Sequence, residues 1–248
     1  MTKSYQHIVV TGATSGIGRQ LALDYAEKGL RVTGLGRDQE ALSKLSESGI
    51  GTAQVDVTKP EEVKAFFDQL DKVDLLILVA GNCIYMDALN YKSDVVQKML
   101  DVNVMGISHC IEHAMPLLKA SKGHIVGVGS ASAYAPLPRA EGYGASKACI
   151  HYLLRTLAIS LKPAGVKVTM VAPGFVDTPL TRKNDFPMPF KVSVQEASNY
   201  IQRGIERGST EIEFPLPLIL SVKSIGLLPT KLFSAIWHRI YDPSKREN

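Results

Sequence analysis

The chain contains 248 residues, of which 45% are hydrophobic and 21% are charged, an ordinary composition for a globular protein. Its net charge of +4 comes from scattered basic residues, which argues against a nucleic-acid-binding surface, so we expect no nucleic-acid partner. The three cysteines are odd in number and lack metal-ligand spacing, which predicts free thiols, no metal site and a reducing, cytoplasmic location.

Two features of the sequence bear on targeting and membranes. The first residues run directly into a strand-like segment, HIVVTG, so no signal peptide is predicted. No apolar stretch reaches the roughly 18 unbroken residues that a transmembrane helix needs. We therefore expect a soluble protein, with one reservation that concerns the apolar tail.

Short β-rich runs alternate with longer helical patterns along most of the chain. In chain order, the expected strands cover residues 7–12, 31–36, 51–57, 73–81, 123–130, 166–174 and 210–214. The expected helices cover residues 18–28, 38–47, 59–70, 95–120, 143–161 and 194–207. The run VDLLILVAG at 73–81 is almost uninterrupted in its apolar character, which is typical of a central parallel strand covered on both faces. The alternation predicts an α/β fold of the Rossmann-like kind: a doubly wound parallel sheet with right-handed crossovers and helices on both faces. We expect a single domain over residues 1–248.

Two segments do not follow the repeating pattern. Residues 175–193 contain three prolines and mixed charge, which predicts a long substrate loop that closes over a site. Residues 215–248 form an apolar C-terminal extension. A helical apolar stripe within it, flanked by basic residues, packs on its own or a neighbouring subunit, or it contacts a membrane peripherally as an interfacial helix. The stripe comprises Leu232, Phe233, Ile236, Trp237 and Ile240, and its flanks comprise Lys231, His238 and Arg239.

A glycine-rich turn, TGATSGIG, joins the first expected strand to the first expected helix. Its glycines, Gly12, Gly16 and Gly18, allow a sharp turn, a close approach of the backbone to a pyrophosphate and tight packing of helix on strand. The following helix N-terminus offers free N–H groups and a partial positive charge to the phosphates. The position of the turn inside a βαβ unit therefore favours a dinucleotide site over a plain tight turn.

The end of the second expected strand indicates which dinucleotide binds. The chain reads GLGRD there, so Gly36 leaves room and Arg37 offers a guanidinium that can bind a phosphate in bidentate fashion. An NAD site usually carries an acidic residue at this position. The acidic Asp38 that follows is expected to cap the next helix instead. We therefore expect a preference for NADP(H) over NAD(H).

Tyr143 and Lys147 lie four residues apart, so their side chains meet on one face of a helix. A free tyrosine has a pKa of about 10 and is a poor base at neutral pH. A nearby ammonium group stabilises the phenolate, so we expect Lys147 to lower the pKa of Tyr143.

With its TGxxxGxG turn and its YxxxK pair, the chain resembles the short-chain dehydrogenase/reductase family over residues 4–180, and more loosely up to residue 214. One departure is Val79, which replaces an asparagine that ties neighbouring strands together in the family. The resemblance implies dinucleotide contacts from Gly12, Thr14, Ser15, Gly16, Ile17, Gly18, Arg37, Asp56, Val57, Ala80, Gly81, Tyr143, Lys147, Pro173, Gly174, Val176 and Thr178.

The resemblance also implies four catalytic residues: Asn103, Ser130, Tyr143 and Lys147. Ser130 precedes Tyr143 by thirteen residues, which is the usual separation in the family. Tyr143 exchanges a proton with the substrate oxygen, Ser130 donates a hydrogen bond to that oxygen, and Lys147 orients the nicotinamide ribose. Asn103 holds a water molecule that links Lys147 to solvent. The six histidines lack metal-site spacing with carboxylates, and Cys83 is interpreted as a packing residue.

The sequence thus predicts an NADP(H)-dependent carbonyl reductase or alcohol dehydrogenase that acts on a small-molecule carbonyl or alcohol substrate. Because the loop and the tail are partly apolar, an apolar ketone, aldehyde, steroid-like or acyl-chain compound is favoured over a sugar. The alternative is a catalytically silent dinucleotide-binding sensor or scaffold protein on the same fold, because fold alone does not decide function. An intact set of four catalytic residues favours the enzyme. The resemblance further implies a homodimer or homotetramer.

Overall fold

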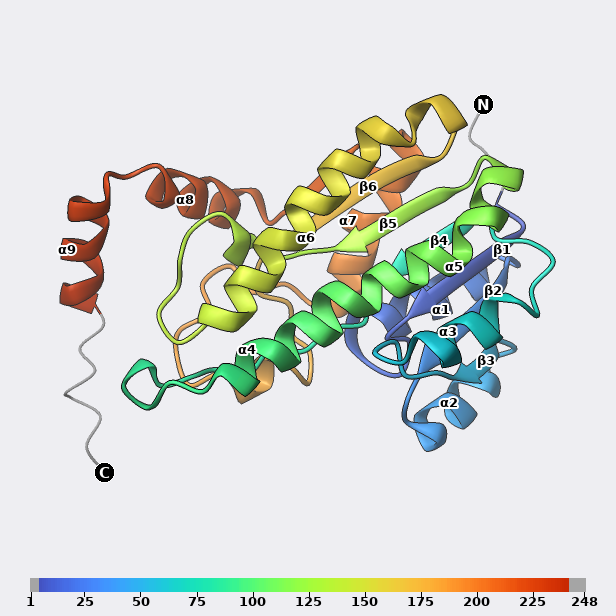
Figure 1. Ribbon diagram of the computed structural model, residues 1–248, viewed down its shortest axis with the longest axis horizontal. Coiled ribbons are helices and arrows are strands. Elements are labelled where there is room, and N and C mark those ends of the chain that lie inside the picture. Colours follow the sequence, from blue (N-terminus) through green and yellow to red (C-terminus); the bar gives the residue numbers. More distant parts are fainter. Residues whose placement is uncertain (1–4, 241–248) are drawn as a thin grey trace.

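The computed structural model describes residues 5–240 and contains a parallel sheet of seven strands in the order β3-β2-β1-β4-β5-β6-β7 (Figure 1). The strands are β1 His7–Thr11, β2 Arg31–Gly36, β3 Gly51–Gln54, β4 Leu75–Leu78, β5 His124–Val128, β6 Lys167–Pro173 and β7 Glu211–Phe214. The chain reverses its direction of progress across the sheet between β1 and β4. In parallel α/β sheets such a switch point is where ligands bind.

Helices cover both faces of the sheet, which confirms the predicted α/β fold. One face carries α1 Gly16–Glu27, α2 Gln39–Ser46 and α7 Val194–Arg207, and the other carries α3 Pro60–Phe67, α5 Gly106–Ser121 and α6 Glu141–Ser160. The central strand β4 shows how the two cores form. Leu76 and Leu78 point into one core while Leu75 and Ile77 point into the other, and all four are fully buried.

One connection departs from the predicted right-handed crossovers. Helices α1 and α7 pack against each other on the same face of the sheet. The β1–α1–β2 and β6–α7–β7 connections nevertheless run in opposite directions across the sheet. The two connections therefore have opposite hands, so the expectation of a right hand throughout was wrong. The long loop 175–193 connects β6 to α7 on that face of the sheet.

The predicted helix over residues 95–120 is interrupted. Helix α4, Ser93–Leu100, is followed by one π-helical segment, Asp101–Met105, before α5 begins. A π segment inserts an extra residue into the helical turn and often marks a functional site. Here Asn103 is the buried residue of that segment.

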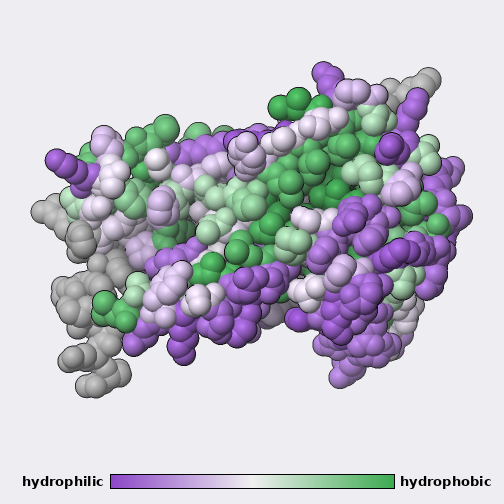
Figure 2. All heavy atoms as spheres, viewed as in Figure 1, coloured by the Kyte–Doolittle hydropathy of each residue, from purple (hydrophilic) through white to green (hydrophobic). Residues whose placement is uncertain are grey.

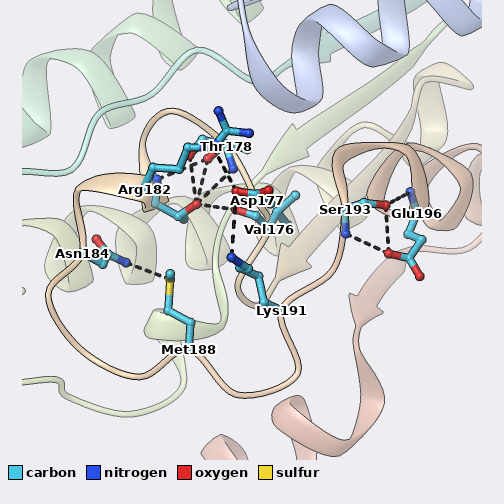
Figure 3. Close-up of polar contacts among 10 residues, drawn as sticks. Val176, Asp177, Thr178, Arg182, Asn184, Met188, Lys191, Ser193 and Glu196 are labelled. Carbon is cyan, nitrogen blue, oxygen red and sulfur yellow. Dashed lines mark hydrogen bonds and ion pairs between the residues drawn. The ribbon is translucent and has the colours of Figure 1, made fainter.

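The loop and the tail contain more local structure than the sequence pattern predicts. Figure 3 shows that loop 175–193 is held by its own polar contacts, including an ion pair between Arg182 and Asp177. The loop also forms an isolated bridge between Val176 and Val192.

The tail folds into two helices, α8 Leu216–Gly226 and α9 Thr230–Ile240, which lie at one end of the molecule (Figure 1). Within residues 5–240, no helix is long and apolar enough to cross a membrane. The side chains of Ile236, His238, Arg239 and Ile240, named above in the apolar stripe and its basic flanks, lie outside the described residues, as do residues 241–248 of the C-terminal extension.

Candidate active site

The glycine turn lies directly against the end of β4. Gly12 has a φ of +67°, and a Cβ atom there would lie 2.9 Å from the backbone nitrogen of Ala80. A Cβ atom on Gly18 would overlap the carbonyl oxygen of Gly12, and one on Gly16 would lie 3.1 Å from Cγ2 of Thr178. Glycine is therefore required by close packing at this turn, as the motif predicts.

The N-terminus of α1 keeps its amide groups available. Ser15 is the N-cap residue, but its side chain accepts no capping hydrogen bond, and the first turn carries no acidic residue. Free N–H groups and a positive helix end make such a terminus suitable for phosphate. Thr14 lies against β2, where a Cβ atom on Gly36 would overlap it, and the partly buried Ile17 packs into the core beneath the turn.

Arg37 and Asp56 meet at the ends of β2 and β3. Their atoms Nη1 and Oδ2 lie 3.8 Å apart, and the Arg37 side chain is 71% exposed. Burial raises the pKa of Asp56, but hydrogen bonds from Thr58 and the charge of Arg37 outweigh it and leave that pKa below its usual value. Asp38 caps α2 by accepting a hydrogen bond from the Ala41 amide, as predicted.

Hydrogen bonds to the Thr11 side chain connect β1 to the end of β4, a role that the apolar side chain of Val79 cannot perform. Its Oγ1 accepts hydrogen bonds from the amides of Val79 and Ala80, each at 3.1 Å. The buried Val57 packs elsewhere: a Cβ atom on Gly106, at the start of α5, would lie 2.7 Å from its Cγ2.

Asn103 is completely buried, and both the oxygen and the nitrogen of its side-chain amide are hydrogen-bonded. Oδ1 accepts from the Asn82 amide at 2.8 Å, while Nδ2 donates to the Asn82 carbonyl at 3.0 Å and to Ser146 Oγ at 2.9 Å. A Cβ atom on Gly81 would lie 3.1 Å from Asn103 Oδ1 and 3.5 Å from Lys147 Nζ. Gly81 thus lets the asparagine and the lysine approach the same point of the β4 loop.

Tyr143 and Lys147 lie on α6 beside the end of β5. Lys147 is buried, donates a hydrogen bond to the Val128 carbonyl at 3.0 Å, and places Nζ 5.8 Å from the centroid of the Tyr143 ring. Ser130 follows β5, and its Oγ accepts hydrogen bonds from the amide and the hydroxyl of Ser132 at 3.1 and 3.0 Å. The predicted catalytic residues therefore come from the segment after β5, from α6 and from the π segment.

The pKa of Tyr143 differs from the value expected for a tyrosine beside Lys147. Burial raises the pKa of Tyr143 to about 12, although hydrogen bonding with Ser130 and Ser132 opposes this. Burial lowers the pKa of Lys147 to about 8. The expected lowering of the Tyr143 pKa by Lys147 was therefore wrong for this structure, because desolvation of the phenolate dominates. Tyr143 holds its proton at neutral pH, and Lys147 is still largely charged there.

Three supporting residues were missed in the sequence. Ser146 and Asn82 engage the two ends of the Asn103 amide, and the buried His151 accepts a hydrogen bond from the Ser130 amide at 3.3 Å. Burial lowers the pKa of His151 to about 4, so it is a neutral acceptor at physiological pH. The sequence position of His151 could have indicated this role, because His151 lies four residues after Lys147 and so on the same face of α6.

Two further observations concern Cys83 and the residue types that bind metal ions. Burial raises the pKa of Cys83 to about 11, which keeps the thiol protonated and agrees with a packing role. Across residues 5–240, no group of three or more histidine, cysteine, aspartate or glutamate residues is arranged to hold a metal ion.

The segment after β6 connects the site to loop 175–193 and the tail. The Gly174 amide donates to the Phe214 carbonyl at 2.7 Å, and a Cβ atom on Gly174 would overlap Leu218 of α8. Pro173 ends β6, Val176 is buried, and Thr178 reaches back to Gly16. These four predicted contact residues thus run from the sheet edge to the glycine turn.

Comparisons with known proteins agree with this arrangement. The family model described as short chain dehydrogenase matches residues 6–187. An uncharacterized oxidoreductase of Myxococcus xanthus is 34% identical, covering 96% of this chain and 98% of that protein. The 11-beta-hydroxysteroid dehydrogenase-like 3 of Arabidopsis thaliana is 35% identical, covering 84% of this chain and 72% of that protein.

Solved structures show the same fold. A short chain dehydrogenase from Burkholderia cenocepacia J2315, in complex with NADP, superposes with a TM-score of 0.84 at 26% identity and covers 98% of this chain and 100% of that one. A short-chain dehydrogenase from Sphingobium yanoikuyae, in complex with NADPH, gives a TM-score of 0.78 at 24% identity with 98% of both chains covered. The fold, the glycine turn and the extent of these matches lead to one conclusion: the chain belongs to the short-chain dehydrogenase family of oxidoreductases.

Proposed function

We propose that the protein is an NADP(H)-dependent oxidoreductase that interconverts a carbonyl group and an alcohol, with Asn103, Ser130, Tyr143 and Lys147 as its catalytic residues. The observation that carries the proposal is their placement. Lys147 and Asn103 both approach Gly81, which directly follows Ala80, the residue on which the glycine turn packs. A proton donor and a phosphate-binding turn therefore border the same end of the sheet.

The residues present fit a nicotinamide dinucleotide. The three glycines of the turn, Gly12, Gly16 and Gly18, have no room for a side chain, and the uncapped N-terminus of α1 presents amide groups without a competing carboxylate. These are the features that a pyrophosphate requires. When bound, the nicotinamide supplies or accepts the hydride.

The chain's own residues handle the proton. Tyr143, with its pKa raised to about 12, carries a proton at neutral pH and can donate it to the oxygen of a carbonyl substrate. Ser130 holds that oxygen by a hydrogen bond, and His151 fixes the Ser130 backbone. The buried ammonium of Lys147 favours negative charge on the substrate oxygen as it develops, because charges interact more strongly away from water.

Arg37 supports NADP(H) as the preferred dinucleotide. Its exposed guanidinium at the end of β2 is available to a 2′-phosphate, while Asp38, the nearest following carboxylate, is engaged as the cap of α2. Asp56, whose Oδ1 accepts from Thr58 and whose Oδ2 lies near Arg37, is the residue that we expect beside the adenine.

The test is NADPH oxidation against a panel of ketones and aldehydes, with the wild type and the Tyr143→Phe variant. Removing the phenolic proton should lower kcat by about 10² to 10⁴-fold while dinucleotide binding is kept. A wild type that binds NADPH but turns over no member of a broad panel would contradict the proposal, as would near-normal turnover by the variant.

A further inference from the structure

Ser130 is the first residue of a short turn that follows β5. A single turn of 3₁₀ helix, Ala131–Ala133, has Ser130 as its N-cap and Tyr134 as its C-cap, and we call residues 130–134 the Ser130 turn. The amides of Ala133 and Tyr134 donate to the carbonyls of Ser130 and Ala131, each at 3.1 Å. The turn is therefore one small hydrogen-bonded unit, and the place of the Ser130 hydroxyl depends on what holds its two ends.

His151 on α6 contacts both ends of the Ser130 turn. Its Nε2 accepts the hydrogen bond from the Ser130 amide at 3.3 Å. A Cβ atom on Gly129 would lie 2.3 Å from the same nitrogen, so only glycine allows the end of β5 to approach the imidazole this closely. The ring of His151 also meets the ring of Tyr134 in an edge-on arrangement, with centroids 5.1 Å apart.

The far end of the turn is held from β7 and the tail helix α8. The Tyr134 hydroxyl donates to Glu213 of β7. Lys223 of α8 binds both carboxylate oxygens of Glu213, at 2.7 and 2.8 Å, and its Nζ lies 4.7 Å from the centroid of the Tyr134 ring. A cation at that distance from an aromatic ring is attracted to it. The backbone of α8 is close as well, because a Cβ atom on Gly226 would lie 2.1 Å from the Tyr134 carbonyl oxygen.

Glu213 is a charged group that is 81% buried, since its side chain is only 19% exposed. Burial raises its pKa, but hydrogen bonds from Lys223 and Tyr134 outweigh this and leave the pKa below its usual value. Removing one partner of a mostly buried ion pair leaves the other charge poorly compensated. Lys223 and Glu213 thus give Tyr134 one strongly preferred position. Both lie outside residues 6–187, where the family model matches.

We propose that Lys223 and Glu213 are positioning residues, which fix Tyr134 and through it the Ser130 turn, so that the tail helix α8 sets the place of the catalytic serine. The inference rests on the proposed function, in which Ser130 holds the substrate oxygen. Neither residue touches the reacting atoms. They act on the rate because a displacement of about 1 Å in a catalytic group can lower turnover by about a hundredfold.

Two ion pairs on β7 provide a matched pair of variants. Glu213 pairs with Lys223 of α8, whereas Glu211 pairs with Arg155 of α6 at 2.8 Å. Lys223→Met should lower kcat for the best ketone or aldehyde by about threefold to thirtyfold, with an unchanged Kd for NADPH. Arg155→Met should change kcat by less than about twofold, because its ion pair is largely exposed. Lys223→Arg should restore most of the lost kcat, since arginine also binds a carboxylate and stacks on an aromatic ring.

Hydrogen exchange tests the same contacts without any turnover. In the full-length protein, the amides of Ser130, Ala133 and Tyr134 should exchange about tenfold faster in Lys223→Met than in the wild type, because a local opening of the turn costs less. Tyr134→Phe, which keeps the ring but loses the bond to Glu213, should have the same effect. Amides within β5 should be unchanged. A merely structural role of α8 would instead accelerate exchange in β5 and in the turn alike.

Equal kcat in Lys223→Met and Arg155→Met, no recovery in Lys223→Arg, or unchanged exchange in the Ser130 turn would each overturn the inference. The proposed function fails differently. A wild type without turnover would remove the reaction, while the exchange rates would still decide whether α8 holds the turn. Faster exchange with a normal kcat would leave the reaction standing and remove the positioning role.

Discussion

Burial determines the chemistry of the two central side chains. It raises the pKa of Tyr143 to about 12 and lowers that of Lys147 to about 8, because the charged form of each loses its hydration. The result at neutral pH is a protonated phenol beside a mostly charged amine. Such a pair is suited to donating a proton to a carbonyl oxygen and then stabilising the charge that remains. In the proposed reaction, Tyr143 can therefore supply the proton that carbonyl reduction requires.

Replacing Arg37 tests the choice of dinucleotide. Arg37→Ala should raise the KM for NADPH by about tenfold to a hundredfold, since charge-assisted hydrogen bonds to a phosphate contribute about 1.5–3 kcal/mol. The KM for NADH should change little, because NADH lacks the 2′-phosphate. Steady-state kinetics with both cofactors provides the measurement. Arg207→Ala, at an exposed position on α7, serves as the control. A wild type that prefers NADH would remove the role assigned to Arg37.

His151 predicts a pH-dependent stability. The unfolded chain takes up a proton near pH 6.5, whereas burial keeps His151 neutral in the folded state down to about pH 4. The folded pKa is lowered, so the stabilisation is fully present above pH 6.5 and is lost progressively as the pH falls toward 4. At pH 5 the loss should reach about 2 kcal/mol.

The comparison with His151→Gln isolates this contribution. Glutamine retains an oxygen acceptor for the Ser130 amide but does not titrate. Urea unfolding at pH 7.5 and 5.0 should therefore show a smaller loss of unfolding free energy in the variant than in the wild type. Identical losses in both proteins would mean that another group causes the pH dependence.

At the level of secondary structure, the apolar pattern of the sequence predicted several elements with the correct bounds. The predicted bounds of the second strand agree with β2, Arg31–Gly36, and the helix over residues 194–207 agrees with α7. The third strand ends at Gln54 rather than at residue 57. Val55 and Val57 remain buried after the chain leaves the sheet ladder, and an apolar pattern alone does not distinguish a buried strand from a buried loop.

The candidate site was predicted as a set of residues, but not as a network. The motifs located Asn103 and Lys147, yet no local pattern indicates that Asn82 and Ser146 hold the asparagine, because both contacts span at least 21 residues. The π segment that contains Asn103 was also not predicted, since a single inserted residue leaves the helical periodicity almost unchanged. The hydrogen bonds to Asn103 and the π segment depend on tertiary contacts, which the pattern of a single sequence does not reveal.

The glycine turn gives a prediction for the element as a whole. A methyl group at Gly18 would overlap the carbonyl oxygen of Gly12, which is backbone and cannot rotate away. Gly18→Ala should therefore reduce the unfolding free energy by about 1–3 kcal/mol and weaken NADPH binding strongly. Gly49→Ala provides the contrast, because Gly49 has a φ of +76° and open space around it.

Gly49→Ala should lower the unfolding free energy by about 1 kcal/mol, because of backbone strain alone, and should leave NADPH binding unchanged. Thermal unfolding and a fluorescence titration with NADPH would measure both effects. Equal loss of binding in the two variants would show that general destabilisation, rather than the shape of the turn, is responsible.

For the whole molecule, the exposed face of α6 suggests how the chain assembles. Hydrophobic residues form a band along α5 and α6 on the face that Figure 2 shows. Tyr152 and Ile159 are 78% and 77% exposed, and with Cys149 they follow the helical repeat along one side of α6. A large apolar surface of this kind is typical of a protein–protein interface, which agrees with the homodimer or homotetramer expected from the sequence.

Charge placed on this face should therefore separate the subunits. The double variant Tyr152→Glu with Ile159→Glu would place two carboxylates in an apolar contact, where loss of hydration makes association unfavourable. Size-exclusion chromatography with light scattering should give a dimer or tetramer for the wild type and a monomer for the double variant. Leu89→Glu is the matched control, since Leu89 is 84% exposed but lies on a separate turn, Ala88–Asn90, away from α6. A monomeric wild type, or a double variant that still associates, would show that this face is not the interface. In either case α8 and α9, which carry the exposed side chains of Leu216, Leu220, Leu227 and Leu232 on or next to them, would be the next surface to test.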